Sequence, residues 1–122
     1  MKKLIVYTTG GLCNCLRPIS TAVKLANILE RELLIFFEPS FRCPINFNEL
    51  FETKHKFIYA DDLMKLENCC IAASDWDIKQ EERLFGRNIL KVLVNNSKNR
   101  ICPAGYCRPM EKPGRCAGCP DL

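Results

Sequence analysis

The sequence predicts an α/β fold: a three-layer, Rossmann-like parallel sheet followed by a cysteine-rich C-terminal tail. Short apolar runs at residues 3–8 and 33–37 have the continuous hydrophobic character of strands that are buried on both faces. The segment between them repeats its apolar residues at helical spacing. Residues 95–122 lose this periodicity and are rich in proline, glycine and cysteine. We therefore expect a Rossmann-like domain over residues 1–94 and a tail over residues 95–122.

The first 37 residues read as strand, glycine turn, helix and strand. KLIVYT at 3–8 is the first strand, and the glycines that follow it end that strand. The helix is expected to begin at Pro18, because a proline in the first turn loses no helical hydrogen bond. LLIFF at 33–37 is the second strand. This βαβ unit predicts two parallel strands joined by a right-handed crossover.

Weaker patterns predict the remaining elements, and residues 95–122 are expected to add nothing to the sheet. The apolar run at 88–94 fits either a strand or a helix end. The other expected elements are a helical turn at 47–52, a strand at 56–60, a short helix at 61–67, a strand at 69–73 and a helix at 77–85.

Composition excludes several classes of protein. The chain has 122 residues, 48% of them hydrophobic and 26% charged, as is ordinary for one globular domain. Its net charge of +4 comes from scattered Lys and Arg residues, so we expect no nucleic-acid partner. No apolar run is long enough for a membrane span and no secretion signal is visible, so we expect a cytoplasmic protein without a membrane partner. Nine cysteines, an odd number, leave at least one thiol unpaired in a monomer.

The stretch TTGGLCNCLRP, residues 8–18, is the candidate ligand loop. A strand, two glycines and a helix place unpaired N–H groups at the carboxyl edge of a parallel sheet, where an anionic or polar ligand can bind. Asn14 can donate and accept hydrogen bonds, and Arg17 offers a planar fork for phosphate or carboxylate. The spacing matches neither the dinucleotide fingerprint nor the P-loop. A simple tight turn is the alternative.

The loop belongs to a longer stretch, roughly residues 3–52, that carries a wider pattern. The positions of this pattern are Gly10, Gly11, Leu12, Asn14, Leu16, Arg17, Cys43 and the turn at 48–51. With these residues the stretch resembles the N-terminal end of the fucosyltransferase-like glycosyltransferases, which include the nodulation, α-1,2-, α-1,6- and protein O-fucosyltransferase types. Cys13 and Cys15 depart from the family pattern, and a cysteine at position 13 would be strained if its φ were positive.

The resemblance implies the N-terminal half of a GT-B fold, which has two Rossmann-like domains facing a cleft. It implies that the loop binds a sugar nucleotide, with a GDP-fucose-like donor as substrate, or a glycan acceptor. In the family a second domain holds most of the donor, and we do not expect it within these 122 residues. We therefore expect weak or no turnover of the chain alone, and a missing second domain or self-association as partner. No catalytic residue is assigned. The implied substrate-binding residues are Gly10, Gly11, Leu12, Asn14 and Arg17.

The tail cysteines have spacings that leave their state open. Cys102, Cys107, Cys116 and Cys119 can hold zinc, form disulfides or stay free thiols, and no cofactor is favoured. The alternative function is a non-catalytic binding or interaction module with a zinc-holding tail.

Paired acids and a lone histidine complete the candidates. The pairs at 61–62 and 75–77 could supply a general base, although helix capping and surface solvation explain them more simply. His55 is expected to be structural or exposed.

Overall fold

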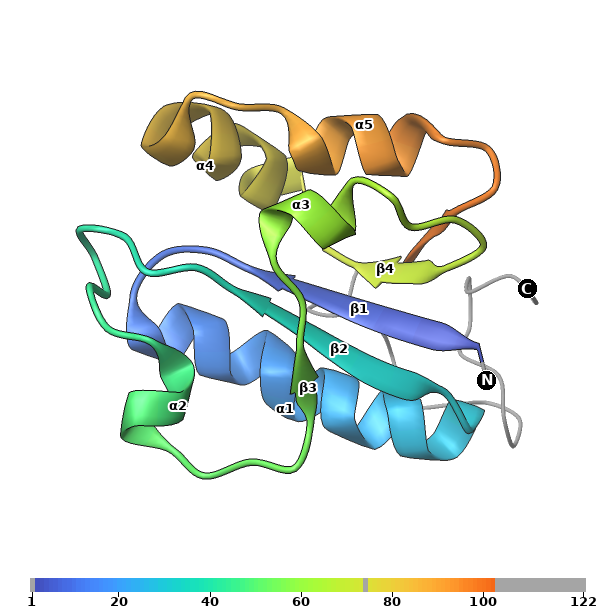
Figure 1. Cartoon of the computed structure of the whole chain (residues 1–122), viewed down its shortest axis with the longest axis horizontal. Helices are drawn as coiled ribbons and strands as arrows, with labels where there is room; N and C mark the ends of the chain where they lie inside the picture. Colours follow the sequence, from blue (N-terminus) through green and yellow to red (C-terminus); the bar gives the residue numbers. More distant parts are fainter. Residues whose placement is uncertain (1, 74, 103–122) are drawn as a thin grey trace.

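The computed structural model describes residues 2–73 and 75–102. Within these residues, five parallel strands form one sheet in the order β3-β2-β1-β4-β5 (Figure 1). The strands are β1 (Lys3–Thr8), β2 (Glu32–Phe37), β3 (Lys56–Phe57), β4 (Cys70–Ala72) and β5 (Arg100–Cys102). The helices are α1 (Leu12–Leu29), α2 (Phe47–Leu50), α3 (Ala60–Leu63), α4 (Asp75–Phe85) and α5 (Ile89–Asn95).

Helices cover both faces of the sheet, so the predicted three-layer α/β architecture is confirmed (Figure 1). Alternate residues of β1 enter opposite cores, because successive side chains of a strand point to opposite faces. Leu4 and Val6 pack in the cluster that contains α1, whereas Ile5 and Tyr7 pack in the cluster that contains α3 and α5. Continuous apolar strands therefore signalled a sheet buried on both sides.

The start of α1 differs from the prediction, since the helix begins at Leu12 and encloses Pro18. Leu12, Cys15 and Leu16 continue the apolar stripe of the helix back to the glycines. Inside the helix Pro18 removes the hydrogen bond to the carbonyl of Asn14, and its ring crowds that carbonyl. A helix start at Pro18 was therefore wrong, because packing of the apolar stripe outweighs this local cost.

Two further expectations are wrong in their extent. The strand expected at 56–60 is limited to Lys56–Phe57, because Ala60 already begins α3. Residues 100–102 lie in the segment expected to add nothing to the sheet, yet they pair with β4 as β5. Three residues are too few to show a periodic pattern. The run at 88–94, which left strand and helix open, is helix α5.

The strand order places a topological switch point between β1 and β4. The chain moves from β1 to β2 and β3 on one side, then returns to β4 and β5 on the other. In open α/β sheets, ligands bind beyond the carboxyl ends of the strands at this point. The loop after β1 and the first turn of α4 meet there. In a separate respect, no helix within residues 2–73 and 75–102 is long and apolar enough to cross a membrane.

Candidate functional site

The two glycines after β1 have different structural roles. Gly10 is buried with a φ of +94°, a conformation that side chains resist. A Cβ placed on it would lie 3.0 Å from Cη2 of Trp76, so the indole packs directly against this residue. Gly11 has an ordinary φ of −69°, and no residue that the structure describes lies within 4 Å of a Cβ placed there. The fold thus requires Gly10, whereas Gly11 leaves open space.

Gly11 is also the N-cap of α1, and it supplies no side-chain hydrogen bond to the helix. The first N–H groups of any helix lack helical acceptors, so those of Leu12 and Cys13 depend on another partner. They lie at the positive end of an 18-residue helix. Open space and uncapped donors thus coincide at the switch point.

The first turn of α4 is attached to the same loop. Thr9 Oγ1 donates a hydrogen bond of 2.8 Å to Asp77 Oδ1. This bond fixes Trp76, which precedes the aspartate, above Gly10 while leaving 41% of the tryptophan exposed. The acids at 75–77 were expected to cap a helix or to face solvent. Asp77 lies in the first turn of α4 and also links two segments 68 residues apart.

Asn14 and Arg17 lie on exposed positions three residues apart on α1. The amide Nδ2 of Asn14 would lie 3.7 Å from a Cβ on Gly10, so this side chain converges on the loop. The main-chain carbonyl of Asn14 has no helical N–H to accept, because residue 18 is proline. Leu12 is half-buried and packs against the core. The structure thus brings Gly10, Gly11 and Asn14 together, with Arg17 one turn along the helix.

The two cysteines of the loop differ in exposure. Cys13 is exposed and lies in α1. Among the described residues other than glycine, Glu30 and Asn68 have a positive φ and Cys13 does not. The backbone strain considered for Cys13 therefore does not arise. Cys15 is buried, with its Sγ 3.7 Å from the carbonyl oxygen of Gly10. Burial raises the pKa of its thiol to about 11. Cys15 therefore remains a neutral thiol that supports the loop from the core.

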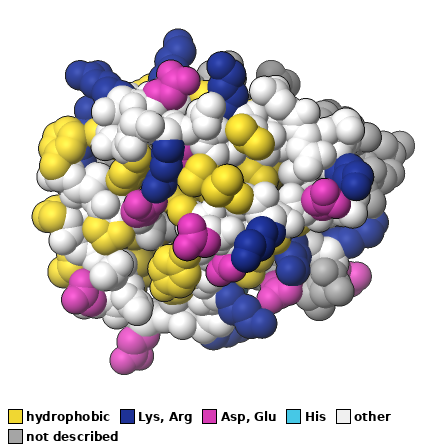
Figure 2. Space-filling model, turned by 45° about the horizontal axis from the view of Figure 1, so that its top comes forward, with side chains coloured by type: hydrophobic (Ala, Val, Ile, Leu, Met, Phe, Trp, Pro, Cys, Tyr) yellow, Lys and Arg dark blue, Asp and Glu magenta, His cyan; other side chains and the backbone are white. Residues whose placement is uncertain are grey.

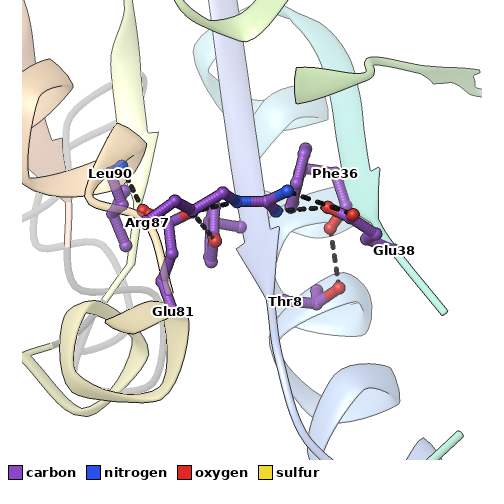
Figure 3. Close-up of polar contacts among 7 residues, drawn as sticks. Thr8, Phe36, Glu38, Glu81, Arg87 and Leu90 are labelled. Carbon is purple, nitrogen blue, oxygen red and sulfur yellow. Dashed lines mark hydrogen bonds and ion pairs between the residues drawn. The ribbon is translucent and has the colours of Figure 1, made fainter. Parts of the chain in front are cut away.

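A charge cluster on the other face of the sheet was missed in the sequence (Figure 3). Glu81 of α4 is buried and accepts hydrogen bonds from the Tyr7 hydroxyl, from Arg87 Nε at 3.4 Å and from the Leu90 N–H at 2.7 Å. Arg87 also binds both carboxylate oxygens of Glu38, which follows β2. Burial raises the pKa of Tyr7, and its hydrogen bond to Glu81 adds to the effect. Glu81 could have been noticed because it shares helical spacing with Ile78 and Phe85.

Acidic and basic side chains are interspersed with apolar ones on the face of the molecule in Figure 2.

The candidate zinc ligands of the tail lie mostly beyond the described residues. Within residues 2–73 and 75–102, no group of three His, Cys, Asp or Glu residues is placed to hold a metal. Cys107, Cys116 and Cys119 lie outside these ranges, as does the side chain of Cys102, so zinc in the tail stays a prediction.

A groove lies along α1. This groove of about 460 Å³ is lined by Leu16, Val23, Phe51 and His55 among others, and by none of the predicted substrate-binding residues. His55 is half-buried in its wall. The groove is mainly apolar, and Leu16 is the residue of the loop at 8–18 that reaches its lining.

Comparison with known proteins identifies no relative: no family model, no curated protein and no solved structure matches the chain.

Proposed function

We propose that the Gly10–Arg17 loop binds a sugar nucleotide or a glycan acceptor, and that the chain is a fucosyltransferase-like glycosyltransferase domain equivalent to the N-terminal half of a GT-B fold. The observation that carries the proposal is the open space at Gly11, beside the uncapped start of α1. The fold does not need a glycine there, whereas close approach of a ligand does. The cytoplasmic location expected from the sequence stays a prediction.

The loop offers groups that suit a diphosphate and a sugar. The N–H groups of Leu12 and Cys13 can donate to phosphate oxygens at the positive helix end. Arg17 adds a cation one turn along α1. The side-chain amide of Asn14 can donate hydrogen bonds to hydroxyl groups and accept hydrogen bonds from them. Gly11 sets no side chain between these groups and the ligand.

Turnover needs more than binding. In glycosyl transfer, the bond from the sugar to phosphate breaks, the acceptor oxygen bonds to the sugar, its proton passes to a base, and GDP leaves. Fixed cations must stabilise the charge on the departing diphosphate. Arg87 cannot serve freely, because Glu38 and Glu81 already bind its guanidinium. We therefore propose that a second domain or a second copy supplies this stabilisation, and that the chain alone turns over weakly or not at all.

The alternative is a binding or interaction module without catalysis. The engagement of Asp77 by Thr9 favours it, because this carboxylate at the switch point has a structural role. A transferase assay on the isolated chain separates binding from turnover. The alternative predicts bound glycan without product, even after a candidate second domain is added.

Calorimetric titration with GDP-fucose and with GDP tests the proposal. We expect both to bind, and Arg17→Ala to weaken binding about tenfold, the usual loss for one charged hydrogen bond. Lys24→Ala is the matched control, because Lys24 is an exposed cation further along α1. Absence of binding heat at millimolar ligand, or equal affinities for the wild type and Arg17→Ala, contradicts the role of the loop in binding the nucleotide.

A further inference from the structure

Two side chains from distant parts of the sequence converge above Gly10. Cη2 and Cζ3 of Trp76 would lie 3.0 and 3.7 Å from a Cβ on Gly10, and Nδ2 of Asn14 would lie 3.7 Å from the same point. The two residues come from α4 and α1. We infer that Trp76 and Asn14 form a subsite for one pyranose ring, which names the part of the ligand that this edge recognises and rests on the proposed function.

The indole is held in place and remains accessible. The Thr9–Asp77 hydrogen bond fixes the turn that carries it, and the lack of a side chain on Gly10 lets its six-membered ring pack against the main chain. Trp76 keeps 41% of its surface exposed, which leaves part of its ring accessible to a ligand. A fixed, partly exposed ring is a platform that loses little side-chain entropy when a ligand stacks on it.

The polar groups around the ring suit a sugar. The C–H face of a pyranose packs on an aromatic ring, while its hydroxyl groups both donate and accept hydrogen bonds. Asn14 answers both needs through its side chain, because the amide nitrogen donates hydrogen bonds and the amide oxygen accepts them.

Trp76 is the only tryptophan of the chain, so its fluorescence reports on this position alone. The full chain is titrated with GDP, with GDP-fucose and with chitotetraose, an N-acetylglucosamine tetramer. We expect at least one sugar-bearing probe to change the emission, and GDP to leave it unchanged. Asn14→Ala should weaken that sugar response about fivefold, as expected for one lost hydrogen bond. Asn27→Ala, at another exposed position of α1, should respond like the wild type.

The outcomes separate this inference from the proposed function. The subsite is refuted if no sugar-bearing probe changes the emission, if GDP changes it as much as GDP-fucose, or if Asn14→Ala responds like the wild type. If any of these outcomes occurs while calorimetry still detects GDP binding, the proposed nucleotide site is supported although the sugar subsite is refuted. A response to chitotetraose without any GDP binding would support the subsite and contradict the nucleotide site. In calorimetry with the responding probe, Trp76→Phe, which keeps a ring, should retain more affinity than Trp76→Ala.

Discussion

The hydroxyl of Tyr7 donates a hydrogen bond to the carboxylate of Glu81, which is 1% exposed and lies 74 residues further along the chain. The same carboxylate accepts the Leu90 N–H at the start of α5 and the Nε–H of Arg87. One buried acid thus joins β1, α4 and α5. Its position beside the carboxyl end of the sheet makes it a support for the edge where the ligand is proposed to bind.

Removal of the Glu81 carboxylate should destabilise the domain strongly. Glu81→Ala leaves three donors without their acceptor, and loss of one member of a buried ion pair costs about 3–5 kcal/mol. Tyr7→Phe removes one of these three donors, a hydroxyl bonded to a charged group, and should cost less, about 1.5–3 kcal/mol. Urea unfolding measures both, with the exposed neighbour Glu82→Ala as control. A Glu81→Ala loss as small as that of the control would show that the cluster does not stabilise the fold.

Stability should fall in alkaline solution. Cys15 keeps its proton up to a pKa of about 11 in the folded chain against 9.0 for an ordinary thiol, and the pKa of Tyr7 is raised too. The unfolded chain therefore loses protons first, so the stabilisation is complete below about pH 9 and is lost toward pH 11. The free energy of unfolding, measured across this range, should decline less in Cys15→Ala than in Cys13→Ala. Equal slopes in the two variants would contradict the raised pKa.

The adjacent glycines should respond differently to alanine. Gly10→Ala must adopt a φ of +94° and bring a methyl group 3.0 Å from the Trp76 ring, so we expect a loss of about 1–3 kcal/mol. Gly11→Ala meets no neighbour within 4 Å and should cost less than about 1 kcal/mol. Thermal unfolding compares the two variants. Similar losses at both positions would mean that the loop differs from the geometry described.

An element could be predicted from the sequence where local residues stabilise it, and could not where distant contacts do. The strand at 3–8 was predicted with its true bounds because an unbroken apolar run is a local signal. The helix was predicted to start at Pro18 because proline is favoured in the first turn of a helix. In the structure, packing of Leu12 and Cys15 in the core sets the start of the helix instead. The strand at 100–102 is stabilised by pairing with β4, a non-local interaction that three residues cannot signal.

The candidate site likewise combines residues that the sequence pattern identifies with residues that only the fold brings together. Gly10, Gly11 and Asn14 were found from a strand–glycine–helix pattern that is contiguous in sequence. Trp76 and Thr9 were not found, because their contacts depend on how β4 lies beside β1. The different structural roles of Gly10 and Gly11 could not be predicted from the sequence either. Only the structure shows that Trp76 fills the space at Gly10 while the space at Gly11 stays open.

A charge placed at Gly11 should separate stability from binding. Gly11→Asp supplies the missing N-cap and a negative charge at the positive end of α1, so we expect a gain of about 0.5–1 kcal/mol. The same carboxylate should repel a diphosphate and remove GDP binding. Gly11→Asn caps the helix without the charge and should weaken GDP binding less. Calorimetry and thermal unfolding provide the two readouts, and undiminished GDP affinity in Gly11→Asp would exclude the helix start as the phosphate site.

The sugar nucleotide is proposed to bind at the loop from Gly10 to Arg17. A nuclear magnetic resonance titration of the nitrogen-15-labelled chain with GDP-fucose locates the bound ligand, because every residue except proline has a backbone N–H that reports separately. We expect the largest shifts at the amides of Gly11, Leu12, Cys13 and Asn14, with smaller shifts at the Trp76 indole. Largest shifts in the groove beside His55, or no shift at the loop under saturating ligand, would contradict it.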